Sequence, residues 1–481
     1  MTPVRIKLVG IERRERPHRL RMPFKFGVTI ATHGRETMVR ATIRLGDGSE
    51  HVGYSAEALG AKWFDKDLSL SDADNHNQLR RSLELASDAY LAAPAATPFD
   101  LFAGHYAGHV AACAAQRLNP LIASYGQSLV DRAILDALCR ALGVSFYEAM
   151  RSNLVGLRPD PVAPELAGLD FGRLFADARP APTIDVRHTV GLSDPIVASD
   201  LAAEARVNDG LPETLEEVVA TYGNRYFKLK VGGDEAVDLD RLARIASVLD
   251  RIEEPYFATL DGNEQYPNAA AIAAFYRKLS ETPALKRLAA SILYVEQPIN
   301  RKEALATPVA DLAKLVPVII DESDGALSAF PEARALGYSG VSSKACKGIF
   351  KSMINHARCR VWNSGGEQQF FMSAEDLTCQ PGIAIQQDLA LVSLLGLTHV
   401  ERNAHHFIDG FGGRSEREAR AFMHDHPDLY HLQDGKVRLH VDQGKFGIGS
   451  LDCPGFGASL APDFDAAEPM PASAWSAREG T

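Results

Sequence analysis

Short apolar runs alternate with amphipathic stretches over the second half of the chain. Eight runs are predicted as strands, at residues 187–192, 226–231, 256–261, 291–296, 316–321, 340–344, 368–374 and 397–401. Their nearly unbroken apolar character is typical of strands buried on both faces. Stretches with helical spacing, such as 268–290 and 346–361, lie between them. This alternation predicts a parallel (β/α) barrel.

The first 60 residues follow a different pattern, in which apolar and polar residues alternate around a "GDG" turn and predict a hairpin. A helical pattern over 129–150 stops near Gly143. After about residue 410 a second short hairpin and several turns are expected to pack back on the rest. We therefore predict an N-terminal α+β domain over 1–155, a Pro/Gly/Ala-rich linker over 156–185, a barrel over 186–412, and a C-terminal segment over 413–481 that ends in a poorly ordered tail.

Composition narrows the possible functions. Of the 481 residues, 46% are hydrophobic and 23% charged, which is a normal globular balance, and the net charge of −11 disfavours nucleic-acid binding. The six cysteines form no Cys-x-x-Cys pair, so neither a zinc ribbon nor a disulfide framework is indicated. The N-terminus lacks a signal-peptide pattern, and no apolar run is long enough to span a bilayer. We expect a cytoplasmic protein without membrane or nucleic-acid partners.

Charged residues end the successive predicted strands, about one strand–helix unit apart. They are Lys228, Lys230, Asp261, Glu296, Asp321 and Lys344. The carboxyl ends of parallel barrel strands meet at one mouth, so three carboxylates should converge there with lysines on either side. Three oxygen ligands suit Mg²⁺, and also Mn²⁺, with positions left open for substrate and water. Crowding between Lys228 and Lys230 is expected to keep one lysine partly deprotonated, as a base must be.

Five short motifs in register, "KLK", "LDGN", "VEQP", "IDES" and "SSKACKG", resemble those of the enolase superfamily. Within it, the chain is similar to the muconate-lactonizing-enzyme-like subgroup of the mandelate racemase/muconate lactonizing enzyme family. The resemblance covers most of the chain. It implies a (β/α)7β-type modified TIM barrel, and an N-terminal α+β capping domain that is completed by C-terminal residues.

The resemblance also implies roles for these residues. Asp261, Glu296 and Asp321 would bind Mg²⁺, and Lys230 and Lys344 would be acid/base groups on opposite faces of the substrate. Lys228 would lower the pKa of Lys230 and contact the substrate carboxylate. Asn263, Gln297 and Glu322 would support the metal ligands from behind. Glu322 is also a rival ligand, and Lys347 a rival to Lys344.

The implied reaction is Mg²⁺-dependent removal of the α-proton of a carboxylate substrate through an enediolate intermediate. The product is that of a racemase, epimerase or cycloisomerase or, alternatively, of a dehydratase of a hydroxy or sugar acid. The family also implies a homo-oligomer. Two readings from other classes remain: a Schiff-base barrel aldolase, which would leave three aligned acids unused, and a non-catalytic scaffold, which predicts broken motifs.

Specificity is expected from the N-terminal domain, whose loops close over the barrel mouth in the family. His33, Arg35 and Lys62 could meet a second anionic group of the substrate, whereas Phe24, Phe26 and Trp63 could pack on an apolar one.

Other substrate contacts are expected at the last strands. Ser373 could contact substrate or cap the next helix. Glu401 stands with Arg402 and Asn403 where dipeptide epimerases carry Asp-x-Asp, which disfavours an amino-acid or dipeptide substrate. No histidine ends strand seven, which disfavours a His/Asp pair of the mandelate racemase type, and the histidines at 405 and 406 receive no role.

Overall fold

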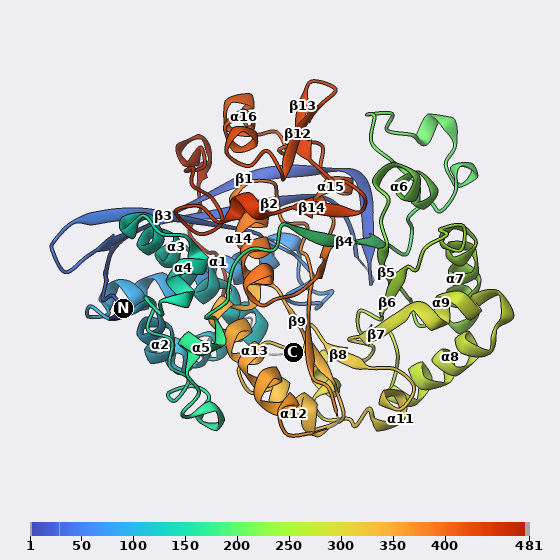
Figure 1. Cartoon of the computed structure of the whole chain (residues 1–481), viewed down its shortest axis with the longest axis horizontal. Coiled ribbons are helices and arrows are strands. Elements are labelled where there is room, and N and C mark those ends of the chain that lie inside the picture. The colour runs from blue at the N-terminus through green and yellow to red at the C-terminus, as the bar shows by residue number, and fades with distance from the viewer. Residues whose placement is uncertain (1, 28, 367, 477–481) are drawn as a thin grey trace.

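The computed structural model describes residues 2–27, 29–366 and 368–476 (Figure 1). It contains an N-terminal antiparallel sheet with a layer of helices and a separate, curled parallel sheet. The N-terminal sheet has the order β15-β1-β2-β3. Its strands are β1 (Lys7–Phe26), β2 (Thr29–Arg44), β3 (Glu50–Ala58) and β15 (Glu468–Pro469). The helices of this domain are α1 (Asp72–Ala92), α2 (Pro98–Ala115), α3 (Pro120–Leu142) and α4 (Phe146–Arg151).

The predicted hairpin at the "GDG" turn is confirmed, because β2 and β3 pair antiparallel on either side of it. Helix α3 starts nine residues before the predicted stretch, at Pro120, and ends at Gly143, which has a left-handed φ of 65°. The helix is buried along almost its whole length and lies against β3 and α1. Gly53 and Gly126 permit these contacts: a Cβ would lie 2.0 Å from the Ala137 nitrogen and 2.3 Å from the Ser82 carbonyl.

The parallel sheet has the order β10-β9-β8-β7-β6-β5-β4-β11, and each neighbouring pair is parallel. Its strands are β4 (Thr183–Val190), β5 (Tyr226–Lys230), β6 (Phe257–Asp261), β7 (Ile292–Glu296), β8 (Val318–Ile320), β9 (Gly340–Ser343), β10 (Phe371–Ala374) and β11 (His399–Arg402). All eight predicted strands are therefore confirmed, the first starting four residues before the predicted position.

Helices follow the barrel strands in the order that the sequence predicts. They are α6 (Leu215–Tyr222), α7 (Glu235–Leu249), α8 (Ala269–Glu281), α9 (Lys286–Ser291), α10 (Arg301–Ala304), α11 (Ala310–Ala313), α12 (Ala329–Ala335), α13 (Ile349–Asn363), α14 (Ile383–Leu394) and α15 (Ala404–Phe407). A short helix, α5 (Phe171–Leu174), lies in the predicted linker. Among the described residues, no helix is long and apolar enough to cross a bilayer.

Side chains link the strands at the two ends of the sheet order. Arg187 of β4 reaches across the interior and donates to the Ser373 hydroxyl (3.0 Å) and the Ala374 carbonyl (2.8 Å) of β10. Lys228 of β5 is bound both to Glu375, just after β10, and to Glu401 of β11. The curled sheet is thus held together across its interior at the mouth.

The C-terminal segment returns to both sheets, as predicted. After α16 (Glu416–Asp425), β12 (Tyr430–Gln433) and β13 (Lys436–Leu439) form the second hairpin, and β14 (Lys445–Gly447) pairs antiparallel with β4. β15 then pairs with β1, and the Trp475 indole donates to the Gln116 carbonyl. The prediction of a poorly ordered tail therefore does not hold for the residues up to 476, because they pack on the N-terminal domain. Residues 477–481 lie outside the described part of the chain.

Candidate active site

The six charged strand-end residues meet at the mouth of the curled sheet. Lys228 and Lys230 lie on β5, Asp261 ends β6 and Glu296 ends β7. Asp321 and Lys344 directly follow β8 and β9. Each apolar strand places its charged end in the interior, where every one of the six side chains is at most 6% exposed. Charges so deeply buried need partners.

Lys228 occupies the centre of the site. Its ammonium lies 3.0 Å from Asp261 Oδ2, 3.0 Å from Glu296 Oε1, 2.6 Å from Glu375 Oε2 and 2.9 Å from Glu401 Oε2. Burial alone would lower the pKa of Lys228, but attraction to these four carboxylates outweighs it and holds the pKa well above its usual value. Lys228 therefore acts as a fixed positive charge.

The other two lysines each pair with one carboxylate. Lys230 donates to Asp261 Oδ2 at 2.5 Å, and Lys344 is bound to Asp321 Oδ2. Burial would lower the pKa of Lys344, but Asp321 raises it. We expected neighbouring cations to lower the pKa of a lysine, but the pKa values of Lys228 and Lys344 are raised, because attraction to the carboxylates outweighs both burial and the neighbouring cations.

Asp261, Glu296 and Asp321 are the candidate metal ligands. Among the residues that the structure describes, no group of three Asp, Glu, His or Cys side chains is spaced to hold a metal ion. This is because lysines lie between Asp261, Glu296 and Asp321. The donor set nevertheless fits Mg²⁺, which prefers carboxylate oxygens. Glu296 Oε2 is buried without a hydrogen-bond partner. Burial, followed by repulsion from Asp261, raises the pKa of Glu296 well above its usual value, so this carboxyl lacks a sufficient counter-charge.

The three predicted supporting residues lie next to these carboxylates. The Asn263 main-chain N–H donates to Asp261 Oδ1 (2.8 Å), and Gln297 Oε1 accepts the Asp321 N–H (2.9 Å). Both residues have a left-handed φ, 40° for Asn263 and 34° for Gln297, which costs free energy and is typical of functional sites. Glu322 instead faces the Asn263 amide and Lys66, each at 3.2 Å.

A pocket of about 150 Å³ lies between this mouth and the N-terminal domain. Most of the predicted substrate contacts line it, namely Phe24, Phe26, His33, Arg35, Trp63 and Glu401. They lie there together with Lys228, Lys230, Asp261, Asn263, Asp321 and Lys344. Lys347 does not line the pocket, although it lies 3.1 Å from Asp321 Oδ1. The pocket therefore favours Lys344 over its rival.

Ser373, another predicted substrate contact, is not among the residues that line the pocket. Its hydroxyl bonds inside the barrel to Glu375 Oε1 (2.6 Å), Arg187 (3.0 Å) and the Tyr294 hydroxyl (2.5 Å). The alternative prediction, a cap for the next helix, is wrong, because Ser373 lies within β10.

Sequence reasoning missed Glu375 and Arg187. Glu375 joins Lys228 to Arg187, each at 2.6 Å, and all three side chains are fully buried or nearly so. The sequence does contain a signal for Glu375, because this residue comes directly after strand β10. The other strands carry their charged residues at the corresponding position. Asp376, the next residue, lines the pocket.

His405 and His406 lie in α15 and pack with His188 of β4, with ring centroids 5.6 and 4.9 Å from the His188 ring. All three are buried. Burial lowers the pKa of His188 to about 3 and lowers those of His405 and His406 well below their usual value. The cluster is neutral at neutral pH.

Comparisons with known proteins were made for both sequence and structure. No protein-family model and no curated protein matches the chain. An enolase from Bradyrhizobium, solved with magnesium and mandelic acid, is 16% identical with a TM-score of 0.59, over 97% of this chain and 98% of that one. The muconate lactonizing enzyme of Pseudomonas fluorescens, solved with muconolactone, is 18% identical with a TM-score of 0.57, over 95% and 97%. The L-Ala-D/L-Glu epimerase of Bacillus subtilis is 15% identical with a TM-score of 0.55, over 94% and 98%.

The chain has the enolase-superfamily fold. The similarity extends over nearly the full length of both chains, so it includes the N-terminal domain as well as the barrel. In this enolase-superfamily fold, the six charged residues all stand at the carboxyl ends of barrel strands, and residues of the N-terminal domain line the pocket at the same place.

Proposed function

We propose that this protein is an enzyme that removes the α-proton of a carboxylate substrate with the help of Mg²⁺, through an enediolate intermediate. A racemase, epimerase or cycloisomerase is the leading assignment, and Mn²⁺ is an alternative metal. One observation carries the proposal: Lys230 and Lys344 line the same pocket from β5 and β9. These strands are four places apart in an eight-strand order, so their lysines approach from opposite sides. Two opposed amines are what two-sided proton transfer at one carbon requires.

The residues then divide the work. Asp261, Glu296 and Asp321 would hold Mg²⁺, which when bound supplies a Lewis acid that stabilises the negative charge developing on the substrate carboxylate. Lys228, fixed by its four carboxylates, contributes a permanent positive charge nearby. Lys230 and Lys344 take and return the proton at the α-carbon, each on its own face. To accept the α-proton, Lys344 must be a neutral amine, so its ion pair with Asp321 must break and its ammonium must first release a proton.

Similar structures support this chemistry. They include an enolase with magnesium and mandelic acid, a muconate lactonizing enzyme and an L-Ala-D/L-Glu epimerase. A Schiff-base aldolase explains the barrel lysines but leaves the three aligned carboxylates Asp261, Glu296 and Asp321 without a role. We further propose a homo-oligomer in the cytoplasm, where all six cysteines can remain free thiols.

The test is a screen of carboxylic acids in D₂O with Mg²⁺, followed by NMR. We expect deuterium to replace the α-proton of at least one acid, and Asp261→Asn to abolish the exchange while the circular dichroism spectrum stays unchanged. Product analysis then distinguishes the epimer from the 2-keto acid of a dehydratase. If a broad panel shows no exchange beyond that of the Asp261→Asn variant, the proposal fails.

A further inference from the structure

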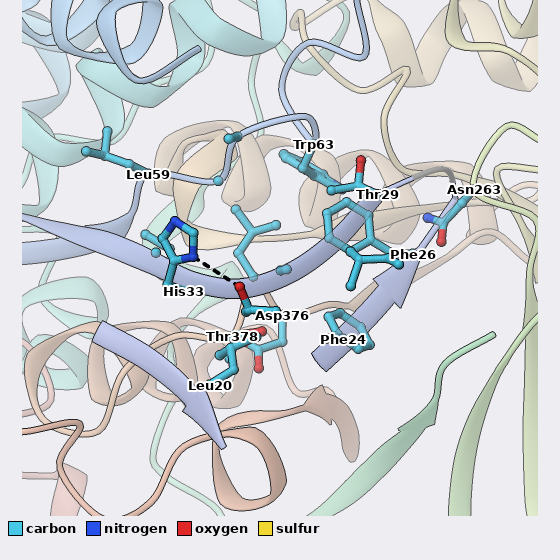
Figure 2. Close-up of a pocket in the computed structure, with 18 of the residues that line it drawn as sticks. Leu20, Phe24, Phe26, Thr29, His33, Leu59, Trp63, Asn263, Asp376 and Thr378 are labelled. Carbon is cyan, nitrogen blue, oxygen red and sulfur yellow. Dashed lines mark hydrogen bonds between the residues drawn. The ribbon is translucent and has the colours of Figure 1, made fainter. Parts of the chain in front are cut away.

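The part of the pocket that faces the N-terminal domain has a mainly apolar wall. It is formed by Leu20, Phe24, Phe26, Leu59, Trp63 and Leu377. Figure 2 shows Phe24, Phe26 and Trp63 gathered at one end of the pocket, with His33 and Leu59 at the other. Phe24 is fixed in place, because its ring packs 4.7 Å from Phe407 and 5.7 Å from Phe26.

Trp63 connects this wall to the reacting centre. The Lys344 ammonium lies 4.6 Å from the Trp63 ring centroid, and the indole packs edge-on against Phe64. A substrate whose α-carbon lies beside Lys344 must therefore place the group attached to that carbon against an aromatic surface. Such a surface favours an apolar body, since each buried CH₂ contributes about 0.8 kcal/mol.

The cations that could bind a second anionic group are already paired. Apart from Lys228, Lys230 and Lys344, the only lysine or arginine among the described lining residues is Arg35. Its guanidinium is bound to the buried Glu15 (2.7 Å) and to Glu468 (3.0 Å). Lys62, the other predicted candidate, is not a lining residue and donates to the Asp67 and Leu70 carbonyls.

Two of the lining histidines, His18 and His76, add no charge that would replace these cations. Burial lowers the pKa of His18 to about 4 and lowers that of His76, so both are neutral near pH 7. His33 lies 3.1 Å from the Thr32 hydroxyl, through its Nδ1. All three rings can form hydrogen bonds, and those of His18 and His76 do not form an anion site.

The buried carboxylates on the same pocket are equally committed. Glu401 accepts the Thr189 hydroxyl (2.5 Å) on one oxygen and Lys228 (2.9 Å) on the other. Asp376 accepts the Cys379 and Asn403 N–H groups, at 2.8 and 2.9 Å. Asp72 also lines the pocket but is exposed, so water already solvates its charge. No buried carboxylate among these is left for a substrate ammonium.

We infer that the substrate is a monocarboxylate whose body is uncharged and mainly apolar, packed against Trp63, Phe26 and Phe24. The inference rests on the proposed function, because it assumes that the carboxylate end lies among the barrel lysines. Dicarboxylates, sugar acids and amino acids with a free ammonium are excluded as substrates: a second carboxylate or an ammonium would be buried without a partner, and a polyol would face the apolar wall.

The test compares four matched acids with the full chain and Mg²⁺: 2-phenylpropanoate, phenylsuccinate, phenylalanine and gluconate. Calorimetry measures binding, and NMR in D₂O measures exchange of the α-proton. We expect 2-phenylpropanoate to bind at least about tenfold more tightly than each of the other three. An unpaired buried charge in phenylsuccinate or phenylalanine, or unpaired buried hydroxyls in gluconate, should cost more than the 1.4 kcal/mol that tenfold represents.

A variant pair locates the apolar contact. Propanoate has the same carboxylate but no ring, so the affinity ratio of 2-phenylpropanoate to propanoate isolates the contribution of the body. Phe26→Ala should reduce this ratio by about tenfold, and the milder Phe26→Leu by less. Val237→Ala, at a 61% exposed position on α7 outside the pocket, is the control and should leave the ratio unchanged.

The outcomes separate this inference from the proposed function. Equal or tighter binding of phenylsuccinate, phenylalanine or gluconate, or an unchanged ratio in both Phe26 variants, overturns the substrate class even if exchange occurs. A third outcome is that 2-phenylpropanoate binds selectively, but neither its α-proton nor that of any other bound acid exchanges. This outcome supports the substrate class and contradicts the proposed reaction.

Discussion

Removal of one lysine at a time offers the sharpest test of the two-sided site. Lys230 and Lys344 approach the pocket from strands four places apart, so each should touch only one face of the α-carbon. Lys344→Ala should therefore abolish turnover but retain exchange of the α-proton with one enantiomer, and Lys230→Ala should retain it with the other. A positioned acid/base group increases the rate about 10²–10⁴-fold, so α-proton exchange of the enantiomer whose base was removed should slow by about that factor.

The assay follows α-proton exchange of each pure enantiomer in D₂O by NMR. Lys347→Ala is the matched control. Lys347 lies 3.1 Å from Asp321 Oδ1, as part of the same ion-pair group as Lys344, but outside the pocket. Its loss should slow both enantiomers by the same factor, because it contacts Asp321, Asp324 and Ser342 but lies outside the pocket, and so it touches neither face of the α-carbon. Full activity in both Lys230→Ala and Lys344→Ala, or equal slowing of both enantiomers in each, would refute the assignment of two opposed bases.

Three further predictions test the metal, the pH dependence and the assembly. Asp261→Asn, Glu296→Gln and Asp321→Asn should each weaken Mg²⁺ binding in calorimetry, whereas Glu322→Gln should weaken it much less. Unchanged Mg²⁺ affinity in the first three variants would mean that the metal does not bind at these carboxylates. His188 has a folded pKa of about 3 against 6.5 unfolded, so its contribution to stability is complete above pH 6.5 and is lost as the pH falls from 6.5 to 3. At 1.36 kcal/mol per unit, His188 alone should account for about 2 kcal/mol of the stability lost between pH 7.5 and 5, so the loss measured in denaturant titrations should be smaller by about that amount in His188→Gln; an equal loss would contradict the assignment. Light scattering at micromolar concentration should show a dimer or larger, and a monomer would count against the oligomer.

The barrel and its charged mouth could be predicted because each strand is an apolar run that ends in a charge. Asp261 and Glu296 close their strands in this way, and in a parallel barrel such ends must meet. The start of α3 could not be predicted from periodicity. The helix is buried on nearly all sides, and its early turns include buried polar residues such as Gln127 and Ser128, so they show no apolar stripe.

The pairing of charges depends on contacts that periodicity cannot see. Arg35 was expected to be free to meet a substrate anion, yet its partner Glu468 comes from the far end of the chain through the β15–β1 pairing. Glu375 was not predicted as a site residue, because it follows a strand end that already carries Ser373, a plausible polar residue. In both cases the sequence shows the group, but only the fold shows which charge it meets.

The charges at the mouth are balanced in the structure, and this balance constrains how ligands can bind. Five carboxylates, Asp261, Glu296, Asp321, Glu375 and Glu401, face five cations, Lys228, Lys230, Lys344, Lys347 and Arg187. In this buried site Mg²⁺ alone adds two positive charges and a monocarboxylate alone adds one negative charge, whereas together they add one positive charge and attract each other. Each should therefore raise the affinity of the other, and by the same factor, since coupling between two sites is reciprocal. Calorimetric titration of Mg²⁺ with and without 2-phenylpropanoate measures this factor. Equal Mg²⁺ affinity in both titrations would mean that the two ligands do not share this group of charges.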